Sequence, residues 1–196
     1  MSVLVTGGAG YIGSHMVYAL LDRGEHPVVL DNLSTGIRGL VAEDATFVEG
    51  NAGDQNKVRD LIQDMAIDAV VHFAGSIVVP ESVENPLSYY ANNTVTSRNL
   101  IEACVAEGVR NFVFSSTAAV YGTPERMPVT EDEDTNPINP YGRSKLMTEW
   151  MLRDTAAAHD FSYAALRYFN VAGADAGGGA GQSTPRATHL IKRACQ

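Results

Sequence analysis

The sequence predicts an α/β fold, a Rossmann-type doubly wound parallel sheet with helices on both faces. Three observations favour this fold. A glycine-rich turn follows the first apolar run, apolar runs then alternate with helical stretches, and polar or small residues follow most of these runs. Alternating strands and helices form parallel sheets, and right-handed crossovers give the strand order 3-2-1-4-5-6.

The apolar and helical patterns assign the elements in order. The first helix is expected to end at Gly24, and each later apolar run is followed by a helical stretch or a turn. The expected strands are 3–5, 28–30, 46–48, 69–73, 111–115 and 163–167, and the expected helices are 12–22, 55–64, 86–107, 141–159 and 188–194. Ligands of such a sheet bind beyond the carboxyl ends of its strands, so the residues after each run form the candidate site.

Length and composition indicate one soluble globular core. The 196 residues are 45% hydrophobic, which suffices for a single substantial core. No run is long enough to span a membrane and no charged leader precedes the first strand, so we expect a cytoplasmic protein without a membrane partner. The net charge of −9 argues against a nucleic acid partner. Because Cys104 and Cys195 are not clustered and the acidic run 131–134 has no flanking histidine, we expect no metal site.

The turn after the first run has the spacing of a dinucleotide-binding motif. Gly7, Gly10 and Gly13 fit G-x-x-G-x-x-G, and Gly8, Gly10 and Gly13 also fit G-x-G-x-x-G. Without side chains in the turn, a diphosphate can approach the backbone, where the first N–H groups of a helix bind it. A glycine-rich turn in an ordinary strand–helix unit is the alternative that this motif alone leaves open.

An acidic residue follows the second run at the place expected for an adenosine ribose ligand. Asp31 follows Gly13 by 31 − 13 = 18 positions and precedes Asn32. A carboxylate there accepts hydrogen bonds from both ribose hydroxyls and repels a 2′-phosphate. The sequence therefore favours NAD over NADP, and an acid that merely opens a turn is the alternative.

A tyrosine and a lysine lie four residues apart at the start of the helix after the fifth run. Tyr141 and Lys145 then share one helical face, where the lysine cation favours the phenolate. Free tyrosine has a pKa near 10, so it needs such a neighbour, or a bound nicotinamidium, to act as a base near neutral pH. The hydroxyl of Thr117, at the end of the preceding strand, can bind a substrate hydroxyl. Chance spacing of tyrosine and lysine is the alternative.

Together these motifs resemble the extended short-chain dehydrogenase/reductase family, and within it the epimerases that invert C4 of a UDP-hexose. The resemblance is carried by residues 6–13, 31–32, 72–75, 86–93, 115–117 and 167–170 and by Tyr141-x-x-x-Lys145. It implies tightly held NAD and a UDP-sugar substrate. The implied reaction removes the proton from the sugar 4-hydroxyl, passes through a transient 4-keto sugar and returns the hydride to its other face. We also expect a homodimer.

The resemblance implies a role for each matching residue. Tyr141 is the expected base, Lys145 the expected ligand of the nicotinamide ribose, and Thr117 stands where the family often has serine. The residues expected at the cofactor are Gly7, Gly10, Tyr11, Ile12 and Gly13 for the diphosphate, Asp31, Asn32, Asn51 and Ala52 for the adenosine, Phe73 and Ala74 for the middle, and Asn92, Tyr141, Lys145 and Phe169 for the nicotinamide side. Substrate binding is expected from Thr117, Tyr141 and Asn170, the last of which holds the diphosphate of the substrate.

Three departures from the family pattern bear on these expectations. Asn51 stands where many relatives have an aspartate that accepts from adenine, so adenine binding is expected to be weaker. Ile77 stands where some epimerases have a lysine near the cofactor diphosphate. The family continues beyond Gln196 into a substrate-binding lobe. We therefore expect an NAD-binding domain at 1–172, a flexible glycine-rich loop with the start of that lobe at 173–196, and little or no turnover.

Other functions remain open on the sequence alone. A nucleotide-sugar 4,6-dehydratase needs an acid pair after the hydroxyl residue, but Ala118 and Ala119 follow Thr117. A ketoreductase uses the same tyrosine and lysine and differs mainly in exchanging its cofactor. From a different class, a non-catalytic NAD-binding module is the third alternative. These residues do not distinguish UDP-glucose, its N-acetylated form and a UDP-pentose as substrates.

Overall fold

A parallel sheet forms the centre of the fold. This computed structural model describes residues 1–183 and 190–195, and its six-stranded sheet has the order β3-β2-β1-β4-β5-β6. The strands are β1 (Ser2–Thr6), β2 (His26–Asp31), β3 (Thr46–Glu49), β4 (Ala69–His72), β5 (Asn111–Ser115) and β6 (Ser162–Leu166). The predicted doubly wound fold and its strand order are confirmed, although some strands, such as β2, are longer than expected.

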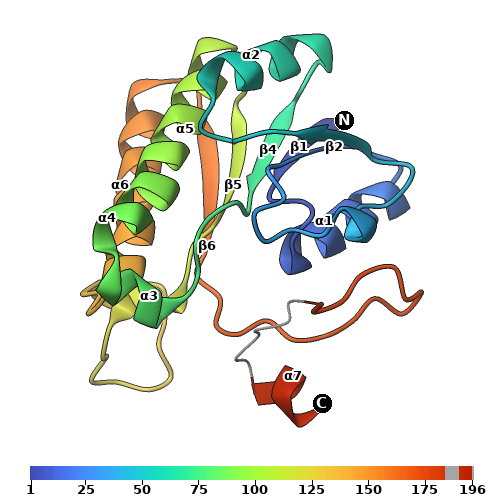
Figure 1. Ribbon diagram of the computed structural model, residues 1–196. Helices are drawn as coiled ribbons and strands as arrows, with labels where there is room; N and C mark the ends of the chain where they lie inside the picture. Colours follow the sequence, from blue (N-terminus) through green and yellow to red (C-terminus); the bar gives the residue numbers. More distant parts are fainter. Residues whose placement is uncertain (184–189, 196) are drawn as a thin grey trace.

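Helices cover both faces of the sheet (Figure 1). Helix α1 (Tyr11–Asp22) packs on one face, and α2 (Gln55–Asp64), α5 (Thr96–Ala106) and α6 (Pro140–Ala158) pack on the other. Right-handed crossovers that run in opposite directions from β1 produce this two-sided covering. The central strands β1, β2 and β4 are buried on both faces and are nearly continuous apolar runs, whereas the edge strand β6 is mostly exposed.

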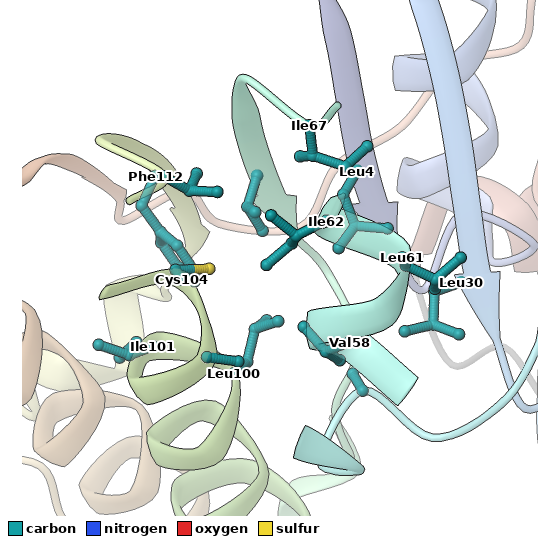
Figure 2. Close-up of a cluster of buried hydrophobic side chains, with 14 of the residues drawn as sticks. Leu4, Leu30, Val58, Leu61, Ile62, Ile67, Leu100, Ile101, Cys104 and Phe112 are labelled. Atoms are coloured by element: carbon teal, nitrogen blue, oxygen red, sulfur yellow. The ribbon is translucent and has the colours of Figure 1, made fainter. Parts of the chain in front are cut away.

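Two hydrophobic cores lie on these two faces. The larger core joins the sheet to α2, α5 and α6, and Figure 2 shows side chains from the sheet and from the first two of these helices converging in it. Its members include Leu4, Leu30, Val58, Leu100 and Phe112, and those of the core under α1 include Val5, Val17 and Val29. Each such side chain contributes about 1.5–3 kcal/mol when it is fully buried. The two cores therefore hold the carboxyl ends of the strands in fixed positions.

The stretch 86–107, expected as one helix, is divided in the structure. A π-helical segment, η2 (Tyr90–Val95), separates α4 (Pro86–Tyr89) from α5. The side chain of Asn93 in η2 is buried and bonds to Ser76 and to α6. These tertiary hydrogen bonds stabilise a wider helical turn of a kind that is frequent at functional sites.

Shorter helices complete the fold. Those that the sequence did not predict are η1 (Arg38–Leu40), α3 (Val79–Glu84) and η3 (Ala118–Tyr121). Helix α7 (Leu190–Ala194) corresponds to the expected helix over 188–194, of which residues 188 and 189 lie outside the described residues. Among the helices of the described ranges, none combines the length and the apolar character that a membrane crossing requires.

The chain leaves the sheet after β6 and runs back past α1 (Figure 1). The Tyr11 hydroxyl, at the start of α1, donates to the Gly173 carbonyl at 2.7 Å. Further along, Gly179 lies so close to the Tyr18 ring that an added Cβ would be 2.6 Å from it. The segment expected as a flexible loop therefore has defined contacts with the helix that follows the glycine turn.

Candidate functional site

The glycine turn between β1 and α1 leaves no room for side chains at three of its positions, one of which is Gly8, where a Cβ would lie 2.7 Å from Cγ1 of Val29. Gly7 has φ +72°, and a Cβ there would lie 2.6 Å from the amide nitrogen of Ala74. A Cβ on Gly13 would lie 2.2 Å from the Gly7 carbonyl oxygen. Gly7 therefore allows the turn to pack against the residues after β4, and Gly13 allows α1 to pack against the turn.

The remaining motif glycine, Gly10, has a different environment. A Cβ on Gly10 would meet only the Gly7 carbonyl oxygen, at 3.2 Å, so neighbouring protein atoms do not fill this space. Gly10 is also the N-cap of α1, and within the described chain no side chain caps that end of the helix. Its first N–H groups are thus available to an anion. The turn fits the diphosphate of a dinucleotide.

Asp31 lies at the carboxyl end of β2, beside this turn. Its Oδ2 accepts from the backbone N–H of Ala9 at 3.0 Å, and its Oδ1 accepts from that of Leu33 at 2.8 Å. Each carboxylate oxygen has a second lone pair, so both retain capacity for the hydroxyls of a ribose. Gly36 faces the same carboxylate, because a Cβ added to Gly36 would lie 2.8 Å from Oδ1 of Asp31. The sequence pattern does not indicate this close approach.

The other residues expected at the adenosine lie in the loops after β2 and β3. Asn32 is exposed, and its Oδ1 accepts from the Ser34 N–H at 3.1 Å. The Oδ1 of Asn51 accepts from the Gly53 N–H at 2.8 Å. This oxygen has a second lone pair, so it can still accept from adenine, as an uncharged acceptor. Ala52 is buried in the larger core.

The residues after β4 lie against the glycine turn. The N–H of Phe73 donates to the Thr6 carbonyl at 2.9 Å, and Ala74 packs against the larger core. Two consecutive asparagines of η2 then hold Ser76: the amide of Asn92 donates to its hydroxyl at 2.9 Å, and Asn93 accepts from its N–H at 2.7 Å. The sequence pattern does not assign a role to Asn93. The sequence signal that could have indicated it is the pair of consecutive asparagines within the predicted helix 86–107.

A buried histidine links the end of β1 to the start of α5. Nδ1 of His72 lies 2.6 Å from the Thr6 hydroxyl, and Nε2 lies 2.9 Å from the Ser97 hydroxyl. Because Ser97 donates its own proton to the Asn93 carbonyl, it accepts from Nε2–H of His72. Burial, reinforced by the charge of Lys145, lowers the pKa of His72 to about 3. His72 is therefore neutral at physiological pH.

The start of α6 places Tyr141 and Lys145. Asn139 is the N-cap, with its Oδ1 accepting from the Gly142 N–H at 2.8 Å, and Pro140 is the first helical residue, as both residue types favour. The buried Lys145 ammonium donates to the Ser115 carbonyl at 3.0 Å. Burial lowers the pKa of Lys145 to about 8. The helix thus brings the predicted pair to the carboxyl end of β5.

The environment of the Tyr141 phenol has two opposing effects on its acidity. Burial raises the pKa of Tyr141, and a hydrogen bond with Thr117 opposes that rise. The pKa of Tyr141 is thus raised, in contrast to the lowering expected from Lys145, whose ammonium is bonded to the Ser115 carbonyl. A Tyr141 phenolate near neutral pH requires a further positive charge beside the ring, such as the nicotinamidium ring of bound NAD⁺.

A second tyrosine completes this cluster. The Tyr168 hydroxyl forms a hydrogen bond with the Ser115 hydroxyl, and proximity to Tyr141 adds to the burial that raises the pKa of Tyr168. In contrast Phe169, expected at the nicotinamide side, is 75% exposed, and Asn170 is exposed as well. Successive side chains of an extended segment point in opposite directions, so only one of Tyr168 and Phe169 can face the cluster.

Comparisons with known proteins place the chain in a family. The family model described as "NAD dependent epimerase/dehydratase family" matches residues 3–196. The chain belongs to this family. A UDP-glucose 4-epimerase of Azospirillum brasilense is 59% identical, in an alignment that covers 99% of this chain and 56% of the relative. The corresponding protein of Lactobacillus helveticus is 48% identical, with 97% of this chain and 58% of the relative covered. The chain thus spans little more than half the length of these curated relatives.

Solved structures agree with this membership of the epimerase/dehydratase family. The crystal structure of UDP-glucose 4-epimerase from Brucella ovis in complex with NAD superposes with a TM-score of 0.95 at 49% identity, covering 98% of this chain and 59% of that one. The UDP-Glc/GlcNAc 4-epimerase of Campylobacter jejuni gives a TM-score of 0.86 at 50% identity, covering 98% of this chain and 60% of that one.

The described residues contain no cluster of histidine, cysteine and acidic side chains able to hold a metal ion.

Proposed function

We propose that this chain carries the cofactor-binding and catalytic residues of an NAD-dependent UDP-glucose 4-epimerase. The observation that carries the proposal is the convergence of Tyr141, Lys145 and Thr117 at the carboxyl end of β5, in a sheet whose glycine turn fits a dinucleotide diphosphate. Relatives that are 59% and 48% identical bear this name, and one similar solved epimerase, from Bifidobacterium longum, was determined with NAD⁺ and UDP.

The proposed cofactor site follows the carboxyl ends of the strands. The glycine turn holds the diphosphate, Asp31 accepts from the adenosine ribose, and Lys145 donates to the nicotinamide ribose. The further proposed cofactor ligands are Tyr11, Ile12, Asn32, Asn51, Ala52, Phe73, Ala74, Asn92, Tyr141 and Phe169. When bound, NAD supplies a reversible hydride acceptor for C4 of the sugar.

The protein's own part in the reaction is to move one proton and to hold the sugar. Tyr141 takes the proton of the sugar 4-hydroxyl and later returns it. Lys145 places a positive charge at the carboxyl end of β5, which together with that of bound NAD⁺ favours the phenolate, and Thr117 bonds the reacting hydroxyl. Asn170 is the proposed ligand of the substrate diphosphate, and its exposed position at the end of β6 suits such a role.

The biological setting is proposed from the same relationship. A UDP-glucose 4-epimerase interconverts UDP-galactose and UDP-glucose, so we propose a place in galactose metabolism and in the cytoplasm. We also propose a homodimer, with the groove between α5 and α6 as the candidate interface; Ile101, Val105 and Met151 line it together with the charged side chains of Arg98, Glu102 and Asp154. Multi-angle light scattering of the purified chain tests the dimer, and a monomer at micromolar concentration contradicts it.

A single assay separates the proposed epimerase from its alternatives. The purified chain is incubated with NAD and UDP-galactose, and UDP-glucose and reduced cofactor are followed together. Formation of UDP-glucose without net change in NAD supports the epimerase, whereas oxidation of the sugar that produces reduced cofactor in equal amount supports a ketoreductase running in reverse. NAD binding with no sugar conversion, even at an enzyme concentration well beyond the excess of about 10²-fold that offsets the expected loss of turnover, supports the non-catalytic module. Loss of water from the sugar would indicate a dehydratase.

A further inference from the structure

Helix α6 carries a third polar residue in line with Tyr141 and Lys145. Glu149 follows Lys145 by the same four-residue step, so the three side chains share one face of the helix. Glu149 is only 6% exposed, although it is acidic and lies in the middle of the helix. A buried carboxylate is costly unless it is paired, so its partners indicate what it does.

Two consecutive residues, the last of β5 and the one after it, each bond to a member of this row. The Ser115 carbonyl accepts from Lys145, and the Ser116 hydroxyl donates to Glu149. Thr117 comes next, and its hydroxyl lowers the pKa of the Tyr141 phenol against the effect of burial. The segment that supplies the substrate-side hydroxyl is therefore attached to α6 at the two residues before Thr117, and Glu149 provides the nearer of these attachments.

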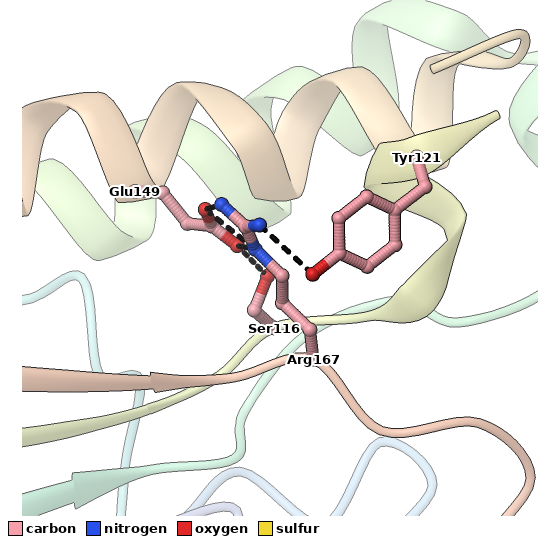
Figure 3. A network of polar contacts seen from close by, with 4 residues as sticks. All are labelled: Ser116, Tyr121, Glu149 and Arg167. Atoms are coloured by element: carbon pink, nitrogen blue, oxygen red, sulfur yellow. Dashed lines mark hydrogen bonds and ion pairs between the residues drawn. The ribbon is translucent and has the colours of Figure 1, made fainter. Parts of the chain in front are cut away.

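Arg167 attaches the end of β6 to the same carboxylate (Figure 3). Its Nη2 lies 2.6 Å from one Glu149 oxygen, and its Nε lies 3.1 Å from each of the two. Its Nη1 donates to the Tyr121 hydroxyl at 3.0 Å. Tyr168, the next residue along the chain, bonds to Ser115 through its hydroxyl and accepts from the N–H of residue 118 through its carbonyl. Glu149 thus joins the ends of β5 and β6 directly beneath the tyrosine cluster.

We propose that Glu149 is a positioning residue of the site, whose carboxylate holds the ends of β5 and β6 so that Thr117 and Tyr168 keep their places against Tyr141. A buried ion pair adds little net stability, because desolvation offsets its Coulombic gain. The Glu149–Arg167 ion pair lies between the strand ends that lead to Thr117 and Tyr168. Its role is therefore better explained by holding these two segments in place than by stabilising the fold. The inference rests on the proposed role of Tyr141 as the base, but its test needs neither cofactor nor turnover.

The test compares the variant Glu149→Asp with Glu107→Asp. Aspartate keeps the charge at position 149 but is one methylene shorter, so it cannot reach both Ser116 and Arg167. Glu107 is the matched control because it pairs with Arg59 at 2.5 Å and has a side chain only 10% exposed, yet lies at the end of α5. Both variants are expected to lower the melting temperature, so stability alone does not distinguish a positioning role.

The distinguishing readout is the titration of the Tyr141 phenol. Proteins labelled with 3,5-difluorotyrosine, whose phenol is more acidic than that of tyrosine, are titrated by ¹⁹F NMR, with Tyr141→Phe assigning the resonance. The titratable groups facing this phenol are Lys145 on α6, Tyr89 on α4 and Tyr168 after β6. Loosening of the Thr117 hydrogen bond is expected to lower the acid dissociation constant of Tyr141 about threefold or more in Glu149→Asp, and to leave it unchanged in Glu107→Asp.

Two further variants show whether the effect passes through Thr117. In a Thr117→Val background, Glu149→Asp is expected to change the Tyr141 titration no further, because both changes act on one hydrogen bond. Ser116→Ala removes the hydrogen bond from Ser116 to Glu149 and leaves the Arg167–Glu149 ion pair. This variant tests the proposal if Glu149→Asp does not fold. A Tyr141 titration unchanged by both Glu149→Asp and Ser116→Ala overturns the proposal. Failure of the proposed epimerase function would instead appear only in the sugar assay.

Discussion

The motif glycines differ in what excludes a side chain from each, and this difference predicts different outcomes for substitution. At Gly13 an added Cβ would overlap the Gly7 carbonyl at 2.2 Å, whereas at Gly10 the same contact is 3.2 Å. We expect Gly13→Ala to lower the free energy of unfolding by about 3 kcal/mol or more. Gly10→Ala is expected to cost about 1 kcal/mol or less and to weaken NAD binding at least tenfold, about 1.4 kcal/mol.

Urea denaturation and calorimetric titration measure these two effects separately. The control is Gly39→Ala, since no atom lies within 4 Å of the Cβ position at Gly39. Tight NAD binding by a folded Gly10→Ala protein would show that the open space at this glycine does not receive the diphosphate.

Asp31 gives a prediction about cofactor choice. Its carboxylate is 8% exposed and anchored by the N–H groups of Ala9 and Leu33, so it cannot swing away from an incoming 2′-phosphate. We expect NAD to bind at least tenfold more tightly than NADP, about 1.4 kcal/mol. The variant Asp31→Asn, which keeps the acceptor oxygen without the charge, is expected to narrow this ratio. Calorimetry with both cofactors measures the ratio, and equal affinities in the unaltered protein refute the assignment.

His72 predicts how stability depends on pH. Its pKa is about 3 in the folded protein, against 6.5 for the free side chain, so the unfolded chain binds a proton that the folded one excludes. The stabilisation is complete above about pH 6.5 and decreases as the pH falls toward 3. Between about pH 7 and pH 5, the free energy of unfolding is expected to fall by about 2 kcal/mol more than in His72→Gln, which cannot titrate. Urea denaturation at both pH values measures this difference, and equal losses in the two proteins would contradict it.

At the scale of elements, the sequence predicts the strands and helix starts that depend on the local sequence pattern. The strands and their order follow from apolar runs that alternate with helical stretches, and the start of α6 follows from an asparagine N-cap before a proline. The division of the expected helix 86–107 does not follow, because it depends on contacts of Asn93 with residues far away in the chain. The same holds for Tyr168, whose partner Ser115 lies on another strand.

The π-helical segment η2 predicts unequal effects for its two asparagines. Asn93 is 2% exposed, and its side chain bonds to the N–H and carbonyl of Ser76 and to the Ser144 hydroxyl. Asn93→Ala is expected to lower the free energy of unfolding by about 2–3 kcal/mol, because it leaves buried polar groups without partners. The exposed neighbour Asn92 makes one bond to Ser76, so Asn92→Ala is expected to cost about 1 kcal/mol or less. Urea denaturation of both variants tests the difference, and similar losses would mean that η2 is not held by Asn93.

At the scale of the whole molecule, the two cores lie on the faces of the sheet, and the site lies at the carboxyl ends of its strands. The apolar side chains fix the strands from both faces, and the polar groups gather where the strands end. The net charge of −9 gives no general attraction for a dinucleotide or a UDP-sugar, both of which are anions. Binding must therefore come from local donors, chiefly the open end of α1 and the ammonium of Lys145.

This distribution predicts how the 196-residue chain behaves by itself. The proposed cofactor ligands lie around the described sheet, so we expect the chain to fold and to bind NAD. On the substrate side, Asn170 is exposed, and the chain aligns with only 56% of the length of the Azospirillum brasilense relative. Binding energy missing from remote parts of a substrate is lost from the positioning of its reacting carbon as well. We therefore expect NAD binding with a turnover of UDP-galactose at least about 10²-fold below that of a complete relative.

Tyr141→Phe is the control for this prediction, because it removes the proton acceptor and leaves the backbone that binds the diphosphate unchanged. It is expected to bind NAD as the unaltered chain does and to abolish any residual conversion. Calorimetry with NAD and chromatography of the UDP-sugars, run on both proteins beside the complete Azospirillum brasilense enzyme, give the required comparison. A rate close to that of the complete enzyme would show that Thr117, Tyr141 and Asn170 suffice to hold a UDP-hexose. Conversion that persists in Tyr141→Phe would require a different base, and the nearby hydroxyl of Tyr168 would be the first to test.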